Sequence, residues 1–416
     1  MRRVKLHILY GVSLSLLCIN FASAQTQPIR VRAALDFSKV STFVAGEYSQ
    51  GQHDYIALIN ARGGIAGTPV EIETADTAND PETGLEVYER FKKEGAVLIN
   101  VLSTPVTKAV LPRAIADGMN LMTAFSGRSD AIDGTVFPCI FPLTPVYWSQ
   151  AAVILSYIGH KENGNLKGKK ITLVHIDQAF GQEPIPIFEK FAQKEGFIFE
   201  AVPYPSPGKN QSAQWTKVAQ SKPDWVVIWG AGLAQPISIK TALKNGIAPD
   251  RIVSPIWLSE LDMEIAGAEQ AKGVARFEGV ASGRDLPIIK AIETEVIAKG
   301  AAAEDATRVG TTYYNIGVAT MALFAEGARL ALENGGSPLT PAKLTKGFER
   351  IKNFTADGLL PPVTVTSKDH QGGGQGRISV WDGNGWKPET GWFAASQDMV
   401  WELVRKNSAE FKAKGQ

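Results

Sequence analysis

The chain has 416 residues, of which 44% are hydrophobic, and 43 Lys and Arg stand against 42 Asp and Glu. A single hydrophobic core rarely grows past about 250–300 residues, so this length predicts two lobes. The charge is balanced and no long run of one sign occurs, which speaks against nucleic acid or an anionic membrane surface as a partner.

The first residues have the pattern of an export signal. Basic residues at positions 2–5 precede a mostly apolar stretch at 8–21, and Ala22-Ser23-Ala24 supplies the small residues of a cleavage site. We therefore predict a signal peptide over residues 1–24 that is removed on secretion.

Two alternatives exist for this segment. A lipoprotein anchor at Cys18 is disfavoured by the bulky Leu17 before it, and an uncleaved membrane anchor would need about 20 apolar residues. Removal of the signal leaves only Cys139, which excludes an internal disulfide and argues against a metal-thiolate site. We expect no metal and no cofactor.

Strands and helices alternate through the first part of the chain. Residues 29–35 alternate in polarity as a strand does, and residues 44–58 carry apolar side chains three and four positions apart, as on one face of a helix. Asp80-Pro81 predicts a helix start, because the Asp side chain can accept an N-terminal N–H and proline fits the first turn. Further strands are expected at 68–73, 96–102 and 120–125. This alternation predicts βαβ units with a parallel sheet.

The pattern then restarts and predicts a second α/β lobe. Strands are expected at 170–176, 197–202 and 225–229, and helices at 184–195, 210–220 and 311–332. Between the two halves, the prolines of residues 137–143 indicate a crossover and not the centre of a strand. Residues 360–362 look like another crossover, and a tail with three tryptophans closes the chain.

Several short motifs follow one another in a characteristic order. They are Ile59-Asn60-Ala61-Arg62-Gly63-Gly64-Ile65-Ala66-Gly67, Asp80-Pro81, Leu102-Ser103-Thr104 and Asp177-Gln178-Ala179-Phe180-Gly181. Behind a signal peptide, this succession resembles the branched-chain amino-acid-binding family of ABC-transporter periplasmic receptors over nearly the whole mature chain. The resemblance implies the α/β type I periplasmic-binding fold, with two Rossmann-like lobes, parallel sheets and three crossovers.

The same resemblance implies a function and a division into lobes. A small-molecule ligand would bind in the cleft, and a permease and ATPase would read the closure; we expect a periplasmic monomer. Crossovers near Phe141, Val280 and Pro362 would divide the chain into a first lobe of residues 28–141 plus 280–361 and a second lobe of residues 142–279 plus 362–416.

Hydroxyl groups follow the predicted strand that ends at residue 102. In open parallel sheets, ligands bind beyond the carboxyl ends of the strands. Ser103, Thr104 and Thr107, with the free N–H groups of a helix start, would suit a carboxylate. By resemblance to the family, Thr104 would bind the ligand head group. Ser103 or Thr104 could instead cap the helix, and the two roles can coexist.

Ser126 and Arg128 follow the next predicted strand and resemble the second head-group loop of the family. A guanidinium can bind a carboxylate through two parallel hydrogen bonds, which makes Arg128 a candidate. Its alternative is a salt bridge with Asp130 or Asp133.

Aromatic residues could form the apolar wall of the cleft. Phe43 precedes the first long helix, Phe180, Trp229 and Trp257 each follow a predicted strand, and Tyr147 lies beside the first crossover. Such rings can stack on a flat ligand, although core packing is an equal explanation. Tyr147 could also brace the hinge.

One feature departs from the amino-acid receptors of the family, which bind the ligand's ammonium group through an acid of the second lobe. Residues 255–257 contain no acid at the matching place, and Glu260 and Asp262 come a few residues late. We therefore expect an apolar or aromatic carboxylate, or another small polar organic molecule, in preference to a branched-chain amino acid or a urea or amide.

An enzyme is one rival class of protein, and a ligand sensor is another. An enzyme is disfavoured because the sequence has no Gly-x-Ser-x-Gly elbow, no His-Glu-x-x-His and no phosphate loop in a strand-to-helix context; the glycines of 372–376 suit a turn better. A periplasmic ligand sensor on the same fold, acting on a signalling partner, is the alternative that the sequence leaves open.

Overall fold

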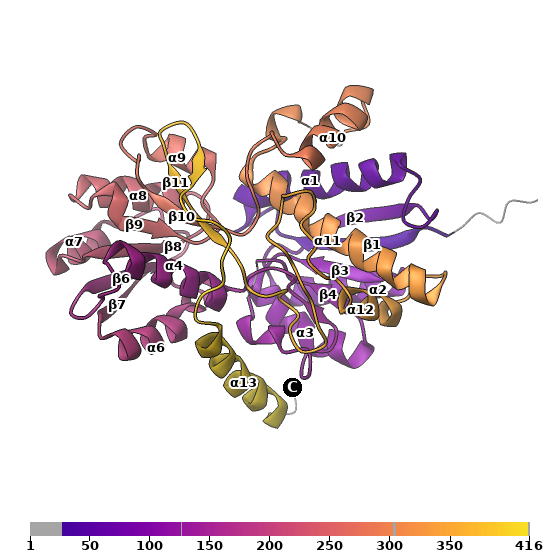
Figure 1. Ribbon diagram of the computed structural model, residues 1–416, viewed down its shortest axis with the longest axis horizontal. Helices are drawn as coiled ribbons and strands as arrows, with labels where there is room; N and C mark the ends of the chain where they lie inside the picture. Colours follow the sequence, from indigo (N-terminus) through magenta and orange to yellow (C-terminus); the bar gives the residue numbers. More distant parts are fainter. Residues whose placement is uncertain (1–26, 126, 303–304, 415–416) are drawn as a thin grey trace, which may run out of the picture.

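The computed structural model describes residues 27–125, 127–302 and 305–414, which fold into two α/β lobes (Figure 1). The sheet of the first lobe is parallel throughout. Its strands lie in the order β2 (Val70–Asp76), β1 (Ile29–Leu35), β3 (Leu98–Val101), β4 (Asn120–Met122) and β5 (Ile140–Phe141).

Helices cover both faces of this first sheet. On one face lie α1 (Thr42–Ala61), α10 (Pro287–Glu295), α11 (Thr312–Gly335) and α12 (Pro341–Phe348); on the other lie α2 (Pro81–Lys93) and α3 (Thr104–Asp117). Helices α1 and α11 approach closely at two glycines. A Cβ on Gly51 would lie 2.2 Å from the carbonyl oxygen of Tyr314, so a larger residue there would separate the two helices.

The second sheet is larger and ends in an antiparallel edge. Its order is β12 (Trp386–Pro388), β11 (Arg377–Trp381), β10 (Ala275–Glu278), β9 (Ile252–Ser254), β8 (Trp225–Trp229), β6 (Lys170–Ile176) and β7 (Ile198–Tyr204), with β11 and β12 antiparallel. One face is covered by α4 (Tyr147–Lys161) and α6 (Ile185–Glu195). The other is covered by α7 (Ser212–Ser221), α8 (Ala234–Lys244) and α9 (Glu260–Ala266).

The strand and helix predictions agree well with this architecture. The strands predicted at 29–35, 170–176 and 225–229 have the bounds observed for β1, β6 and β8. Asp80 caps α2 as expected, since its Oδ1 accepts the N–H of Thr83 at 2.8 Å. The α/β fold with two lobes is therefore confirmed. The sequence indicated a crossover and not the centre of a strand at 137–143; Ile140–Phe141 forms the short edge strand β5, after which the chain passes to the other lobe.

The chain passes between the lobes three times: between β5 and α4, between β10 and α10, and between α12 and β11. At the third passage, His370 stacks on Phe141 with ring centroids 4.1 Å apart, whereas the next residue, Gln371, accepts a hydrogen bond from Ser149 of α4 at 2.9 Å. The sequence placed this crossover near Pro362. The division of residues 362–376, and the lobe boundaries in general, stay a proposal.

The last helix was not predicted. Helix α13 (Gln397–Ala413) lies against both lobes (Figure 1). Val400 and Val404 belong to the core that includes α4 and α6, and Phe411 packs on Phe137 of the first lobe at a ring distance of 4.8 Å. The helix therefore connects the two lobes at one end of their interface.

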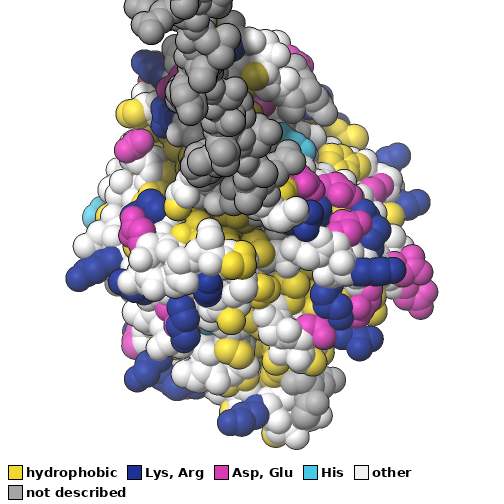
Figure 2. All heavy atoms as spheres, turned by 90° about the vertical axis from the view of Figure 1, so that its right-hand side faces the viewer, with side chains coloured by type: hydrophobic (Ala, Val, Ile, Leu, Met, Phe, Trp, Pro, Cys, Tyr) yellow, Lys and Arg dark blue, Asp and Glu magenta, His cyan; other side chains and the backbone are white. Residues whose placement is uncertain are grey.

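The outer end of the first lobe carries charges of both signs, interspersed around hydrophobic side chains (Figure 2). Within the described ranges, none of the helices is long and apolar enough to cross a membrane. The predicted signal peptide, residues 1–24, lies outside the described residues.

Candidate functional site

A cavity of about 330 Å³ lies between the lobes, at the carboxyl ends of strands from both sheets. The first lobe contributes Val40, Ser41, Phe43, Val44, Asn79, Leu102, Ser103, Thr104 and Pro105; the second lobe contributes Tyr147, Gln178, Ala179, Phe180, Ala231 and Trp257. The described lining residues include no Asp, Glu, Lys, Arg or His. The cavity is therefore mostly apolar, with a few hydroxyl and amide groups.

The loop after β1 is shaped by one buried carboxylate. Asp36 is fully buried, and its two oxygens accept hydrogen bonds from the backbone N–H groups of residues 38–41 at 2.6–3.2 Å. These bonds hold Val40 and Ser41 against the cavity and lead directly into the first turn of α1. The carboxylate of Asp36 thereby fixes the shape of this part of the cavity wall.

The start of α3 supplies the polar groups of the first lobe. Ser103 caps the helix, because its Oγ accepts the N–H of Val106 at 3.3 Å, and it donates to Asn79 Oδ1 at 2.7 Å. Thr104 Oγ1 accepts the N–H of Gly127 at 3.3 Å. The first turns of α1 and α3 both face the cavity, so the positive ends of two helix dipoles meet there.

The second lobe contributes a wall of aromatic rings. Trp257 Nε1 donates to the hydroxyl of Tyr147 at 2.9 Å, and the ring of Phe180 packs edge-on against Tyr147 at 5.2 Å. Burial raises the pKa of Tyr147, so its phenol stays neutral and keeps its own proton as a donor. Three rings held in fixed orientations can enclose a flat or branched apolar group.

The segment that carries Phe180 also reaches across to the first lobe. Glu183 follows the short helix α5 (Ala179–Gln182); its Oε1 lies 3.0 Å from Lys108 Nζ of α3, and its Oε2 accepts bonds from the N–H and Oγ of Ser129 at 3.3 and 3.0 Å. Gly181 makes this possible, since a Cβ there would lie 1.9 Å from the carbonyl oxygen of Ile176.

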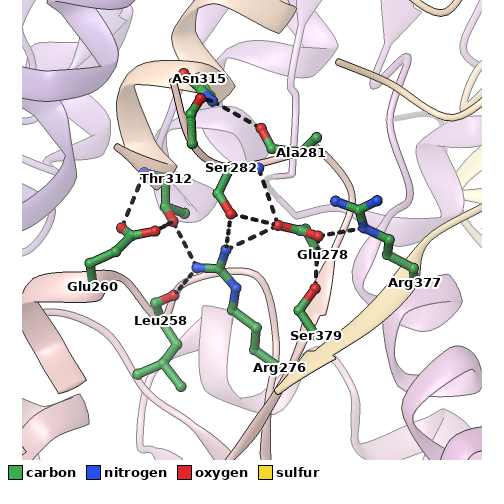
Figure 3. A network of polar contacts seen from close by, with 11 residues as sticks. Leu258, Glu260, Arg276, Glu278, Ala281, Ser282, Thr312, Asn315, Arg377 and Ser379 are labelled. Carbon is green, nitrogen blue, oxygen red and sulfur yellow. Dashed lines mark hydrogen bonds and ion pairs between the residues drawn. The ribbon is translucent and has the colours of Figure 1, made fainter. Parts of the chain in front are cut away.

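A second set of polar contacts joins the lobes near the second passage of the chain (Figure 3). Glu260 of the second lobe accepts the N–H and the Oγ1–H of Thr312 at 3.2 and 2.7 Å. The same Thr312 Oγ1 accepts a bond from Arg276 at 2.7 Å. Thr311, which precedes helix α11, makes no side-chain cap. A carboxylate of one lobe therefore caps the longest helix of the other.

Behind this cap, a buried ion cluster fixes the second passage of the chain. Glu278 Oε1 contacts Arg276 at 3.2 Å, and Glu278 Oε2 accepts bonds from Arg377 and Ser379 at 2.5 and 2.8 Å (Figure 3). Burial alone would raise the pKa of Glu278, but the two guanidinium groups outweigh it and the pKa lies below its ordinary value. Glu278 therefore stays charged, and the second passage of the chain has a defined geometry.

The two lobes, the cavity between them and the three passages of the chain agree with the fold that the sequence motifs implied. The sequence profile described as periplasmic binding protein matches residues 28–386. The chain belongs to the periplasmic binding protein family. The family resemblance that the sequence motifs suggested is thereby confirmed, and family members are substrate-binding proteins of ABC transporters.

Individual relatives of this periplasmic binding protein are distant. A structure described as an ABC transporter permease from the Pseudomonas fluorescens group is 31% identical with a TM-score of 0.86, and covers 93% of this chain and 97% of its own. The Leu/Ile/Val-binding protein BraC3 of Rhizobium johnstonii is 24% identical over 72% of this chain and 82% of its own length. A solute-binding protein of R. palustris in complex with benzoate is 16% identical, with a TM-score of 0.71 over 89% and 97% of the two chains.

Six of the residues predicted for the ligand site of this periplasmic binding protein line the cavity: Phe43, Ser103, Thr104, Tyr147, Phe180 and Trp257. The helix cap predicted as an alternative role for Ser103 is also observed, so this residue combines a structural role with its place in the wall. Contact with a ligand stays a prediction for all six.

Three predicted residues lie elsewhere. Arg128 forms the alternative salt bridge, with Nε and Nη2 at 2.7 and 3.0 Å from the two oxygens of Asp130, and its guanidinium lies over the ring of Phe411. Thr107 is buried one turn into α3, and Trp229 packs behind Tyr147 at a ring distance of 5.7 Å. None of these three is among the lining residues. Ser126 lies outside the described residues.

Several lining residues were missed from the sequence, notably Asn79 and Gln178. Both follow strands of the parallel sheets, β2 and β6, so the strand-end rule that selected Ser103 could also have found them. Gln178 even lies within one of the family-like motifs. Ser41 and Ala231 follow strand ends in the same way.

The described residues show no group of three or more His, Cys, Asp or Glu side chains that could hold a metal ion. Cys139 is buried and donates to the carbonyl oxygen of Ala114, and burial raises the pKa of its thiol to about 12. A thiol in such a setting is a poor nucleophile at neutral pH.

Proposed function

We propose that the chain is the periplasmic substrate-binding component of an ABC importer, which closes on an apolar or aromatic carboxylate between its lobes. A branched-chain amino acid or a urea or amide fits the site less well. In this proposal the protein is a monomer, acts without catalysis, and presents the closed form to a permease and its ATPase.

The observation that carries this proposal is the composition of the cavity wall. Aromatic and aliphatic side chains dominate it, while hydroxyl and amide groups gather at the starts of α1 and α3. A carboxylate would be stabilised there by helix dipoles and by neutral donors such as Ser103 and Thr104. The described wall offers no carboxylate for a ligand ammonium group, which favours an acid that lacks one.

Size gives a second argument. Ligand pockets of proteins usually measure about 300–1,000 Å³, and a volume of about 330 Å³ suits a ligand with the dimensions of a small aromatic acid. The benzoate complex of the R. palustris protein shows that a receptor of this fold can take such a ligand.

The test is a thermal-shift screen of the secreted protein against benzoate, 3-phenylpropanoate, short branched fatty acids, aliphatic amino acids, urea and amides, followed by calorimetry of the best compound. A ligand that binds only the folded state raises the melting temperature by mass action, by an amount set by the ratio of its concentration to Kd. We expect the largest shifts from the aromatic and branched monocarboxylates. The proposed ligand class would be contradicted if urea or an aliphatic amino acid raised the melting temperature most.

A sensor and a transport receptor would bind the same ligand and differ in the partner. Pull-down by the permease reconstituted in lipid discs, with and without the best ligand, separates the two. Ligand-dependent capture by the permease supports import; capture only by the sensor domain of a receptor kinase would support the sensor instead.

A further inference from the structure

Glu183 has an unusual position, because it belongs to the second lobe while its carboxylate is held by the first. Lys108 and Ser129 of the first lobe contact its two oxygens, and its side chain is only 8% exposed. Its backbone is anchored in its own lobe, where Trp148 Nε1 donates to its carbonyl oxygen at 2.8 Å. The contact therefore exists only when the lobes are together.

The same contact lies next to the polar end of the cavity. A Cβ built on Gly127 would lie 3.2 Å from Thr104 Oγ1 and 3.2 Å from the carboxyl carbon of Glu183. Thr104 lines the cavity, and Lys108 lies one helical turn further along α3. Glu183 is thus the acid of the second lobe that comes close to the group expected to bind the ligand head.

We propose that Glu183 is a positioning and specificity-determining residue: its pairing with Lys108 closes the cleft and withholds its carboxylate from a ligand ammonium group. The specificity part rests on the proposed function, whereas the closure part does not. An unpaired carboxylate beside Thr104 would attract a ligand cation. The carboxylate of Glu183 is already paired with Lys108 and hydrogen-bonded to Ser129. An α-ammonium group of a ligand would therefore find no interaction with it that offsets the cost of losing its own hydration.

Closure and the cavity wall are mechanically linked at this residue. Phe180 lies on α5 and Glu183 follows directly after it, with the N–H of Glu183 donating to the carbonyl oxygen of Phe180 at 3.4 Å. When Glu183 engages Lys108, the ring of Phe180 is brought against the cavity.

Removing Lys108 and removing the charge of Glu183 should shift the ligand preference in opposite directions. A loss of stability alone cannot produce this result. We would measure Kd by calorimetry for two matched pairs of acids, 3-phenylpropanoate with phenylalanine and 4-methylpentanoate with leucine. Wild type should prefer the acid without the ammonium group. Lys108→Met leaves Glu183 unneutralised and should shift the preference toward the amino acid by roughly 3- to 10-fold; Glu183→Gln leaves Lys108 and should shift it by a similar factor the other way.

Lys217→Met is the matched control, since Lys217 pairs with Glu200 within the second lobe at 2.9 Å, away from the cavity. For each matched pair of acids, Lys217→Met should leave the ratio of the two Kd values within about 2-fold of the wild-type ratio. Equal shifts in the same direction for Lys108→Met and Glu183→Gln, or an amino-acid preference in wild type, would overturn the specificity assignment.

Closure is measured separately, without any ligand, as the radius of gyration in solution X-ray scattering. The radius of gyration of Glu183→Gln and of Lys108→Met should be larger than that of wild type and of Lys217→Met. Identical radii for all four proteins would overturn the role of the pair in closure. If wild type binds none of the four acids, the proposed ligand class is wrong, and the scattering result alone decides whether the pair holds the lobes together.

Discussion

The two walls of the cavity differ in chemistry. The first lobe presents the hydroxyl and amide groups of Ser41, Asn79, Ser103 and Thr104 beside apolar side chains and the ring of Phe43, whereas the second lobe presents the rings of Tyr147, Phe180 and Trp257 and one amide, that of Gln178. This difference suggests that the first lobe holds the polar head of the ligand and the second lobe covers its apolar body. A ligand with only one of these parts would bind only one lobe and would not favour closure.

The difference has a structural origin. Both lobes place the carboxyl ends of parallel strands at the cleft, so each could in principle offer helix N-termini. In the first lobe the long helices α1 and α3 begin at the cavity. In the second lobe α4 begins at the cavity with Tyr147, the four-residue α5 also begins there, and Trp257 precedes α9. The difference between the walls therefore comes from the side chains at these helix starts, which are hydroxyl and amide groups in the first lobe and aromatic rings in the second.

The largest effect is expected from Trp257→Ala, which removes a ring and the hydrogen-bond donor that orients Tyr147. Affinity for the best monocarboxylate should fall by roughly 30-fold or more, as for a buried aromatic anchor at an interface. Calorimetry measures the loss. Trp257→Phe keeps a ring and should lose much less affinity. Trp401→Ala, on α13, serves as the control and should keep the affinity of wild type. Equal affinities for wild type and Trp257→Ala would remove this ring from the site.

A smaller effect is expected at the polar wall. Thr104→Val keeps the shape of the side chain and removes its hydroxyl, so affinity for a carboxylate should drop by about 10-fold. Thr107→Val is a matched control one turn along α3, because this hydroxyl is buried, has no hydrogen-bond partner among the described residues and does not line the cavity. If both variants lose affinity equally, the assignment of the head group to Thr104 is wrong.

The sequence predicted which loops form the cavity wall more accurately than which side chains line the cavity. The strand-end rule located the loops after β3, β6 and β9, and Ser103, Phe180 and Trp257 duly line the cavity. The rule says which loop faces the cleft. It does not say which side chain of the loop turns inward.

Arg128 and Thr107 illustrate why the rest could not be predicted. Arg128 has a carboxylate two positions away, and the ring of Phe411 from the unpredicted helix α13 completes its surroundings. That contact joins residues 283 positions apart, and a single sequence carries no local signal for it. Thr107 lies one turn beyond the helix start, where it faces the core.

The cap of α11 by Glu260 tests whether closure, and not direct contact, adds to affinity. Glu260→Gln keeps an acceptor for the Thr312 N–H but loses its charge, so the closed form should be less populated and affinity about 3-fold weaker. Glu264→Gln, on the exposed face of the same helix α9, is the control. The effect should appear in the rate of ligand release more than in the rate of binding, because the open form is unchanged. A change confined to the binding rate would argue against a closing role.

The smallest expected effect is on the pH dependence of stability, and it comes from residues that pack behind both walls of the cavity. Tyr313 of α11 packs on Phe43 and on Trp257 at ring distances of 5.5 and 6.1 Å, and its hydroxyl lies 3.4 Å from Asp262 of the second lobe. Burial raises the pKa of Asp262 from 3.8 to about 6. The folded protein therefore holds this proton more tightly than the unfolded chain does. The stabilising contribution is complete below about pH 4 and is lost as the pH rises through about 6.

Asp262→Asn cannot ionise and should escape that loss. The melting temperature of the variant minus that of wild type should rise between pH 4 and pH 7 and then stay constant. Scanning calorimetry at four pH values measures this difference, in which Asp369, whose pKa burial also raises to about 6, cancels because both proteins contain it. Parallel curves for the two proteins would mean that Asp262 is ionised in the folded state throughout. In that case the contact between Tyr313 and the second lobe would depend on a buried charge, and the aromatic and polar walls would be coupled electrostatically as well as by packing.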